Sequence, residues 1–208
     1  MDTVVPAYPV ALDIDYPDRD LNRRTTLLRI FTAIPIVFLL ALIPDSASGW
    51  TGSHWFPLQT TGLLLPTALT LLFARKYPRW WFDWNLAFVK FATRVGAYLA
   101  LLRDEYPSTD DDQAVHITIA YPNAAEDLNR WLPLVKWLLA VPHYVVLAVL
   151  VLASFCSVIA AWFAILVGRR YPRSLFDFQV GVMRWALRVS AYAFLLTTDR
   201  YPPFSLAP

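Results

Sequence analysis

The stretch "YPRWWFDWNLAFVKFATRVGAYLALL" occupies residues 77–102, and "YPRSLFDFQVGVMRWALRVSAYAFLL" occupies residues 171–196. Both begin with Tyr-Pro-Arg, contain Phe-Asp a few residues later and have Ala-Tyr near the end. Two ordered matches of this length indicate an internal repeat. This repeat decides the fold that the sequence predicts.

Shorter matches precede each of these stretches in the same order. "VALDIDYP" at residues 10–17 matches "VHITIAYP" at residues 115–122, and an "LNR" motif follows each of them. We therefore expect a tandem duplication with pseudo-twofold symmetry. The predicted units are residues 1–107 and 108–208, called the first and second half below.

Each half opens with a pattern of period two. Val10, Leu12 and Ile14 alternate with smaller or acidic residues, and the segment starting at Val115 alternates in the same way. Such alternation before a Tyr-Pro step predicts a short, half-buried strand. Since one strand alone buries little surface, the two strands are expected to pair with each other or with the later Tyr-Pro segments.

The composition indicates a membrane protein. Of 208 residues, 57% are hydrophobic and 16% are charged, whereas about a quarter of a soluble protein is charged. One small core cannot absorb so much apolar material, so lipid is expected to solvate part of it. A net charge of +2 argues against nucleic acid as a partner. The single cysteine, Cys156, excludes a disulfide within the chain.

Two apolar stretches follow the strand in each half. In the first half they are residues 27–43 and 58–74. In the second half residues 131–167 form one run, too long at ~1.5 Å per residue for one crossing of a ~30 Å core. The alignment of the repeats places a turn near "LASFCS". The prediction is a transmembrane helical hairpin in each half, with partial penetration of its second helix left open.

The distribution of charge sets the predicted topology. All 18 Lys and Arg residues lie outside the predicted hairpin loops. With two crossings per half, every cation faces one side, as the positive-inside rule requires. The predicted fold is therefore a mainly α integral membrane protein with four transmembrane segments and cytoplasmic termini. Arg29 and Lys136, near the starts of their spans, are expected to extend to the membrane surface.

The third apolar stretch of each half, from Phe82 and from Phe176, differs from the others because it carries charged residues among its aromatic ones. Asp83, Lys90 and Arg94 fall on one narrow helical stripe, and the second half repeats that stripe. A helix with an aromatic body and one charged stripe is typical of the membrane interface. We therefore expect an amphipathic helix in the membrane plane at the end of each half.

Cations and tryptophans around these helices are the candidate lipid-binding residues. Such residues are ordinary at headgroup depth and meet anionic lipid there, which is the alternative to a specific ligand pocket. The candidates are Arg75, Lys76, Arg79, Trp80, Trp81, Trp84, Arg94, Arg169, Arg170, Arg173 and Arg188.

No catalytic motif or phosphate-binding loop is present in the sequence, which predicts a protein that is not an enzyme. His143, inside an apolar helix, is a weak candidate ligand for a haem or porphyrin-type pigment, and a simple hydrogen bond is the alternative. Its partner in the repeat is Ile36, so no bis-histidine site arises. Three scattered histidines predict no metal site.

Two segments of the second half suggest a family. "LNRWLPLVKWLLAVPHYVVL" followed by "GRRYPRSLFDFQVGVMRWALRVSAYAFLLTTDRYPPFSL" resembles a bacterial membrane family known as domain of unknown function 4389. The resemblance extends over nearly the whole chain in two copies, although the first copy has "DEYPS" in place of "DRYPP". It implies a multi-span protein of the bacterial inner membrane and transfers no catalytic residue.

Three functions remain open at this point. The first is an accessory or scaffold subunit that joins a larger membrane complex or self-associates, with a loop carrying Trp50, Trp55 and Phe56 as the candidate partner-binding surface. The second is a lipid-binding or small-molecule transport protein that uses the cleft between two pseudo-symmetric hairpins, with Arg94 and Arg188 on an anionic headgroup. The third is a pigment- or haem-associated subunit that uses His143.

Overall fold

The computed structural model describes residues 8–17, 21–42, 61–109, 111 and 113–207. Six α-helices, two strands, one π-helical and one 3₁₀ segment are formed by these residues. In chain order they are β1 (Val10–Ile14), α1 (Arg23–Leu42), α2 (Thr61–Leu69), η1 (Thr70–Ala74), α3 (Arg79–Leu99), β2 (Val115–Ile119), η2 (Leu132–Leu134), α4 (Lys136–Leu139), α5 (Val141–Gly168) and α6 (Arg173–Ala193).

The two strands form one antiparallel sheet. β1 pairs with β2 so that Leu12 lies opposite Ile117, and Val10 and Ile14 lie opposite Ile119 and Val115. Alternate residues of both strands are buried, so only one face of the sheet is covered. The predicted pair of half-buried strands is confirmed. Leu12 and Ile117 are equivalent in the aligned repeats, so the register is centred on one equivalent pair.

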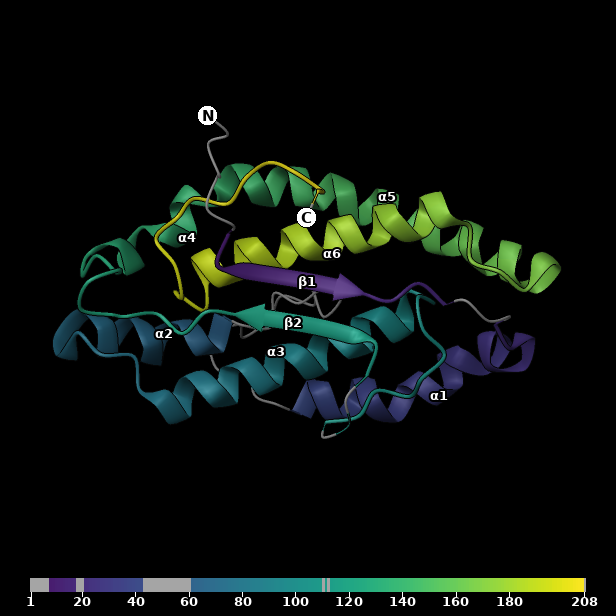
Figure 1. Ribbon diagram of the computed structural model, residues 1–208, viewed down its shortest axis with the longest axis horizontal. Coiled ribbons are helices and arrows are strands. Elements are labelled where there is room, and N and C mark those ends of the chain that lie inside the picture. The colour runs from purple at the N-terminus through teal and green to yellow at the C-terminus, as the bar shows by residue number, and fades with distance from the viewer. Residues whose placement is uncertain (1–7, 18–20, 43–60, 110, 112, 208) are drawn as a thin grey trace, which may run out of the picture.

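Each strand is covered by the last helix of the other half of the chain. α6 packs against β1, and α3 packs against β2. In Figure 1, α6 lies between β1 and α5, while α3 lies on the side of β2 away from β1. α1 packs against α3, and it also contacts α5. The two halves therefore share one large core, and a smaller apolar cluster lies within the second half.

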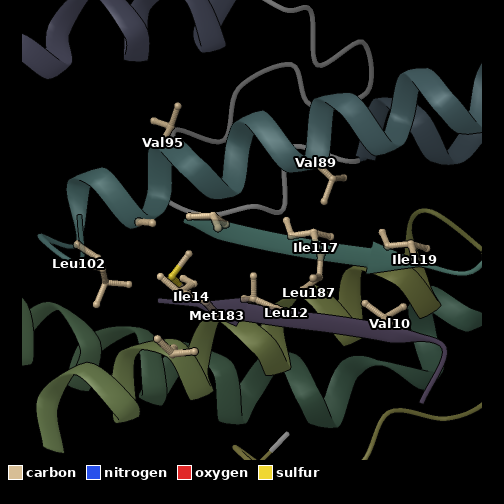
Figure 2. Close-up of a cluster of buried hydrophobic side chains, with 14 of the residues drawn as sticks. Val10, Leu12, Ile14, Val89, Val95, Leu102, Ile117, Ile119, Met183 and Leu187 are labelled. Atoms are coloured by element: carbon tan, nitrogen blue, oxygen red, sulfur yellow. The ribbon is translucent and has the colours of Figure 1, made fainter. Parts of the chain in front are cut away.

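The core lies between the covered face of the sheet and these two helices. Figure 2 shows the inward side chains of both strands together with side chains from α3 and α6. Burial of aliphatic side chains here removes them from water and contributes about 1.5–3 kcal/mol for each large one. The labelled members are Val10, Leu12, Ile14, Val89, Val95, Leu102, Ile117, Ile119, Met183 and Leu187.

A Tyr-Pro step precedes each of the two helices that cover the sheet, α3 and α6. Pro78 and Pro172 precede the first helical residues, and their carbonyl oxygens accept from the backbone N–H groups of Phe82 and Phe176, both at 3.0 Å. Proline suits this position because its fixed φ and missing N–H cost nothing there. The preceding helices end on left-handed residues at equivalent positions, Arg75 with φ 49° and Arg169 with φ 58°.

The prediction of four transmembrane segments is wrong. In the second half, the expected turn near "LASFCS" is absent because α5 continues unbroken from Val141 to Gly168. Ser154 and Ser157, which lie in this segment, are buried, and both hydroxyls donate to Gln179 Oε1 of α6, at 2.8 and 3.1 Å. These serines satisfy their polar atoms inside a helix pair, so no loop is needed.

Helices of the first half also differ from the predicted hairpin. Its apolar helical stretches, Thr25–Phe38 and Leu64–Ala74, are shorter than a membrane crossing requires. Among the described residues, α5 is the one helix that is long and apolar enough to cross a bilayer. The two-crossing topology in each half, and the cytoplasmic termini inferred from it, are therefore corrected.

The predicted interfacial helices lie at the expected positions but are core helices. α3 and α6 bury much of the aromatic body that was expected to meet headgroups, including Phe82, Phe88 and Tyr98. In α6, every residue from Gln179 to Ala193 except Arg184 is buried. The amphipathic pattern was read correctly, but its apolar face covers a sheet. Helical periodicity reports which face is buried and does not identify what buries it.

Candidate functional site

Two aromatic corners join the halves of the molecule. At the first corner the rings of Tyr77 and Phe82 lie 5.8 Å apart, and Phe82 lies 5.0 Å from Tyr121, in edge-to-face contacts. At the second corner Phe176 lies 5.8 Å from Tyr171 and 5.0 Å from Tyr16, also edge to face. Each corner takes two rings from the start of a long helix and one from the strand end of the opposite half.

Tyrosine hydroxyls at the corners donate to backbone carbonyls across the two halves. Tyr121 donates to Tyr77 O, and Tyr16 donates to Tyr171 O. Tyr77 in turn donates to Leu195 O at 2.9 Å, and Tyr171 donates to Ala100 O at 3.3 Å. Burial raises the pKa of Tyr77 and of Tyr171, so both phenols stay protonated as structural donors.

The predicted lipid-binding cations lie around these corners. Arg79 lies over the Tyr121 ring with Cζ 4.7 Å from the centroid, and Arg173 lies over Tyr16 at 4.6 Å. Both also approach the aspartate four residues later, at 3.7 and 3.9 Å. The other four cations, Arg75, Lys76, Arg169 and Arg170, are exposed. Contact of these six cations with lipid stays a prediction.

The tryptophans at the start of α3 form a short ladder. Trp81 stacks on Trp84 with centroids 5.4 Å apart, and Trp84 stacks on Phe88 at 5.7 Å. Trp81 is held in place because its Nε1–H donates to Thr67 Oγ1 at 2.8 Å. Trp80 is 71% exposed. Trp80 and Trp84 are therefore the exposed tryptophans of this cluster, and Trp81 is half-buried.

Two buried ion pairs lie at equivalent places. Arg29 pairs with Asp104, and Lys136 Nζ lies 2.6 Å from Asp199 Oδ1. Each aspartate also accepts a backbone N–H from the "LNR" motif of its own half, Asn22 N at 3.0 Å and Asn129 N at 2.6 Å. The expectation that Arg29 and Lys136 extend to a membrane surface is wrong. Both side chains are buried and neutralised within the protein.

His143 is fully buried in an aromatic cluster. Its ring stacks on Phe204 at 4.0 Å, and its Nδ1 accepts the Nε1–H of Trp185 at 3.1 Å. A neutral imidazole that accepts at Nδ1 carries its proton on Nε2. Among the described residues the buried Nε2 has no hydrogen-bond partner. The hydrogen bond from Trp185 agrees with the simpler alternative, and ligation of a haem by His143 stays a prediction.

Arg94 and Arg188 hold the segments that follow their helices. Arg94 Nη1 donates to Ser108 O at 2.7 Å, and Arg188 Nη2 donates to Ala207 O at 2.9 Å. Residues 201–207 are called the C-terminal strap below. Arg184 Nη1 also donates a hydrogen bond to this strap, at Leu206 O and 3.3 Å. Among the described residues neither Arg94 nor Arg188 pairs with a carboxylate, and the predicted role of both in anion binding stays a prediction.

The outer surface of α5 is the largest candidate interaction surface. It exposes an apolar stripe along the whole helix, made of Val141, Val145, Val146, Val149, Leu152, Phe155, Ile159, Phe163 and Val167. Its opposite side, including Leu147, Ala161 and Ile165, is buried. Further exposed apolar side chains lie on α1, η2 and α4, such as Phe31, Phe38, Leu134 and Trp137. By contrast, α6, β1 and β2 expose no large apolar side chain.

Other candidates are settled only in part. Trp50, Trp55 and Phe56, the predicted partner-binding residues, lie outside the described residues. Within the described part of the chain, no group of three or more His, Cys, Asp or Glu side chains is placed to hold a metal ion. Cys156 is exposed on α5.

Several structural residues escaped the sequence reasoning. The two ion pairs and the tyrosines Tyr16 and Tyr121 were not identified as contacts between segments. The alignment of the repeats contained a usable signal, since Arg29 aligns with Lys136 and Asp104 aligns with Asp199. A basic and an acidic position that keep their charge in both halves favour an ion pair. The two members of each pair lie 75 and 63 residues apart in the chain, so local patterns do not reveal the contact.

Comparison with known proteins gives one match. No curated protein and no solved structure matches the chain. A family model, described as a domain of unknown function (DUF4389), matches residues 131–205. The matched residues contain η2, α4, α5, α6 and most of the C-terminal strap, with Lys136, His143 and Arg188 among them. The match supports the resemblance for the second half of the chain, in one copy.

Proposed function

We propose that this protein is a non-catalytic, membrane-associated accessory or scaffold protein whose helix α5 contacts lipid. The observation that carries the proposal is the unbroken apolar stripe of α5. Nine large apolar side chains on this helix are exposed in the isolated chain. Moving one such side chain out of water contributes about 1.5–3 kcal/mol. A surface of this size favours an apolar environment over water.

In this proposal α5 lies along the membrane surface. α5 packs against α6, and α6 packs against β1. α6 and β1 would therefore lie at the same depth in the membrane as the part of α5 beside them. If α5 crossed the bilayer, Arg184, Arg188 and Asp13 would approach the hydrocarbon with it. Each such charge costs about 2.5–3.5 kcal/mol at mid-depth. An in-plane α5 buries its apolar stripe while leaving those charges in the polar region.

The scaffold role is supported by the way ionisable groups are used. Arg29 and Lys136 neutralise aspartates, and the tyrosines at the corners donate to backbone carbonyls. These groups hold segments together and do not converge on a common point. The exposed aromatic ring of Trp80 and the exposed tryptophans Trp131 and Trp137 suit contacts with lipid headgroups or a membrane partner.

We also propose that the chain is a tandem duplication. Both corners, both ion pairs and both left-handed arginines recur at aligned positions, and the sheet register is centred on Leu12 and Ile117. In such an arrangement each copy completes the other, as in an isologous dimer. The resemblance favours a bacterial inner membrane as the location.

The orientation of α5 can be tested through Cys156, the only cysteine in the sequence. Cys156 lies near the middle of α5 and is exposed. The full chain would be reconstituted in phosphatidylcholine nanodiscs with a spin label at Cys156. In a Cys156→Ser background, Val145→Cys and Phe163→Cys would carry the same label, and collision with oxygen and with a water-soluble nickel complex would report depth.

An in-plane helix predicts similar, shallow depths at residues 145, 156 and 163. A crossing helix predicts a deep label at 156 between two shallower ones. A label at Thr118→Cys on the sheet gives the reference value for full exposure to water. If the labels at all three α5 sites were as exposed to water as this one, lipid contact would be refuted. Thr118 is the matched control because it is exposed on the uncovered face of β2.

A further inference from the structure

Two neighbouring arginines on α6 are held only by neutral acceptors and one distant carboxylate. Arg188 is 4% exposed, and its Nη atoms donate to Ala207 O at 2.9 Å and Ser205 O at 3.5 Å. Arg184, one helical turn earlier, donates to Leu12 O at 3.0 Å and Leu206 O at 3.3 Å. All four acceptors are backbone carbonyls.

Countercharge near this pair is weak. Within the part of the chain that the structure describes, the one carboxylate in ion-pair range is Asp13, 3.9 Å from Arg184 Nη2, and its side chain is 76% exposed. Among the described residues Arg188 has no carboxylate in range, and its buried Nε has no hydrogen-bond partner. The Tyr8 ring lies 5.9 Å from Arg188 Cζ, and its hydroxyl donates to Arg200 O. A buried charge without a counter-ion is costly.

The first half differs in the segment that follows the aligned positions. Lys90 aligns with Arg184, and Arg94 aligns with Arg188; among the described residues the buried Nε of Arg94 also has no hydrogen-bond partner. Arg94 donates to Ser108 O, and the sequence that follows contains three aspartates, "DDD" at residues 110–112. The strap that follows Arg188 reads "YPPFSLA", and its positions 205–207, which align with "DDD", carry no acidic residue.

We infer that Arg184, Arg188 and the C-terminal strap form a binding site for a phosphate-bearing anion. The Nε of Arg188 is available to donate, and an anion would replace neutral carbonyls as the stronger acceptor for the Nη atoms. The anion is a lipid headgroup or free phosphate, which share this chemistry. The inference rests on the proposed membrane association and identifies the ligand class recognised there.

The test uses the full chain in neutral detergent and in vesicles. Inorganic phosphate would be titrated against the thermal unfolding midpoint and compared with chloride at equal ionic strength. In parallel, flotation would measure binding to phosphatidylcholine vesicles with and without an equal amount of phosphatidylglycerol. The variant is Arg184→Gln with Arg188→Gln, and the control is Lys90→Gln with Arg103→Gln, which removes the same charge from the first half at residues outside the predicted lipid-binding set.

We expect at least about tenfold weaker anion binding in the Arg184→Gln/Arg188→Gln variant, because charge-assisted hydrogen bonds are lost. The control variant should keep wild-type binding. A response to phosphatidylglycerol alone assigns a lipid headgroup, a response to phosphate alone assigns free phosphate, and a response to both is shared chemistry. If the double variant does not fold, the wild-type comparison of phosphate with chloride and Arg184→Gln alone still decide.

No difference between phosphate and chloride, together with equal flotation on the two kinds of vesicle, would overturn the site. Equal loss in the control variant would also overturn it, because binding would then follow net charge. The depth of Cys156 in pure phosphatidylcholine does not depend on this site. Failure of the anion site is therefore distinguishable from failure of the proposed membrane association.

Discussion

The two halves of this molecule bury different cations at equivalent points. In the first half the guanidinium of Arg29 pairs with Asp104 and donates to Tyr98 O at 2.9 Å. In the second half the ammonium of Lys136 pairs with Asp199 and donates to Thr198 O at 2.8 Å. Both cations also lie over a tyrosine ring, Tyr98 or Tyr192. The geometry is shared, but the chemistry of the cation differs.

This difference matters because a guanidinium keeps its proton whereas a lysine can lose one. Arginine stays charged when its partner is removed, but a buried lysine shifts its pKa readily. The second half has a further polar group, since His143 takes the place of the buried Ile36. The same framework thus accommodates a permanently charged centre in one half and a titratable one in the other.

The largest effects are expected when the carboxylates of the ion pairs are removed. Asp104→Asn leaves the charge of Arg29 buried without a partner and should lower the free energy of unfolding by about 3–5 kcal/mol. Asp199→Asn should cost less, because Lys136 can lose its proton. Chemical unfolding in detergent, followed by circular dichroism, measures both. A larger loss for Asp199→Asn would contradict the comparison.

The pH dependence of these two variants separates the halves further. Burial lowers the pKa of Lys136, and Asp199 raises it in part. Between that lowered pKa and the ordinary value of ~10.4, the unfolded state binds more protons, so stability rises with pH across this window. Asp199→Asn removes the raising influence and extends the window downward.

We therefore expect Asp199→Asn to recover stability as the pH rises toward the ordinary lysine pKa of ~10.4, while Asp104→Asn does not, since arginine keeps its charge. Unfolding midpoints at several pH values, each taken relative to the wild-type protein, provide the measurement. Parallel pH profiles for the two variants would show that Lys136 keeps its proton.

A medium effect is expected where the strap crosses α6. A Cβ added at Gly181 would lie 2.9 Å from Leu206 Cβ and 3.0 Å from its carbonyl oxygen, so the backbone of the strap must shift. Gly181→Ala should destabilise by about 1–3 kcal/mol. Gly96→Ala on α3 is the matched control, because its nearest neighbour is Met183 Cε at 3.5 Å. Equal melting temperatures for the two variants would argue against a tightly packed strap.

The smallest effect is expected at the histidine of the second half. Trp185→Phe removes the donor to His143 Nδ1 and leaves that buried nitrogen unpaired, at a cost of about 1 kcal/mol or more. Adding His143→Ile should recover part of the loss, because Phe91 and Ile36 form the aligned pair in the first half. A double-mutant cycle measures the coupling. Additive losses would show that the hydrogen bond contributes nothing.

Much of the local structure could be predicted from the sequence. The alternation at Val10–Ile14 and Val115–Ile119 located both strands, and the Tyr-Pro steps located the starts of α3 and α6. Such patterns are read within a few residues, and proline restricts its own backbone. The stripe of charges on α3 and α6 was also identified. What lay against each apolar face could not be predicted.

Long-range partners were decided only by the tertiary structure. The mainly apolar run at residues 131–167 predicts a hairpin, yet its serines donate to Gln179 of α6 and α5 continues without a turn. Arg29 and Lys136 were assigned to a membrane surface, yet aspartates far along the chain neutralise them. By itself the sequence determined the strands and the amphipathic helices, because these depend on local periodicity, and it predicted the repeat. The tertiary structure decided which faces meet protein and which remain exposed, because burial and ion pairing depend on residues distant in the chain.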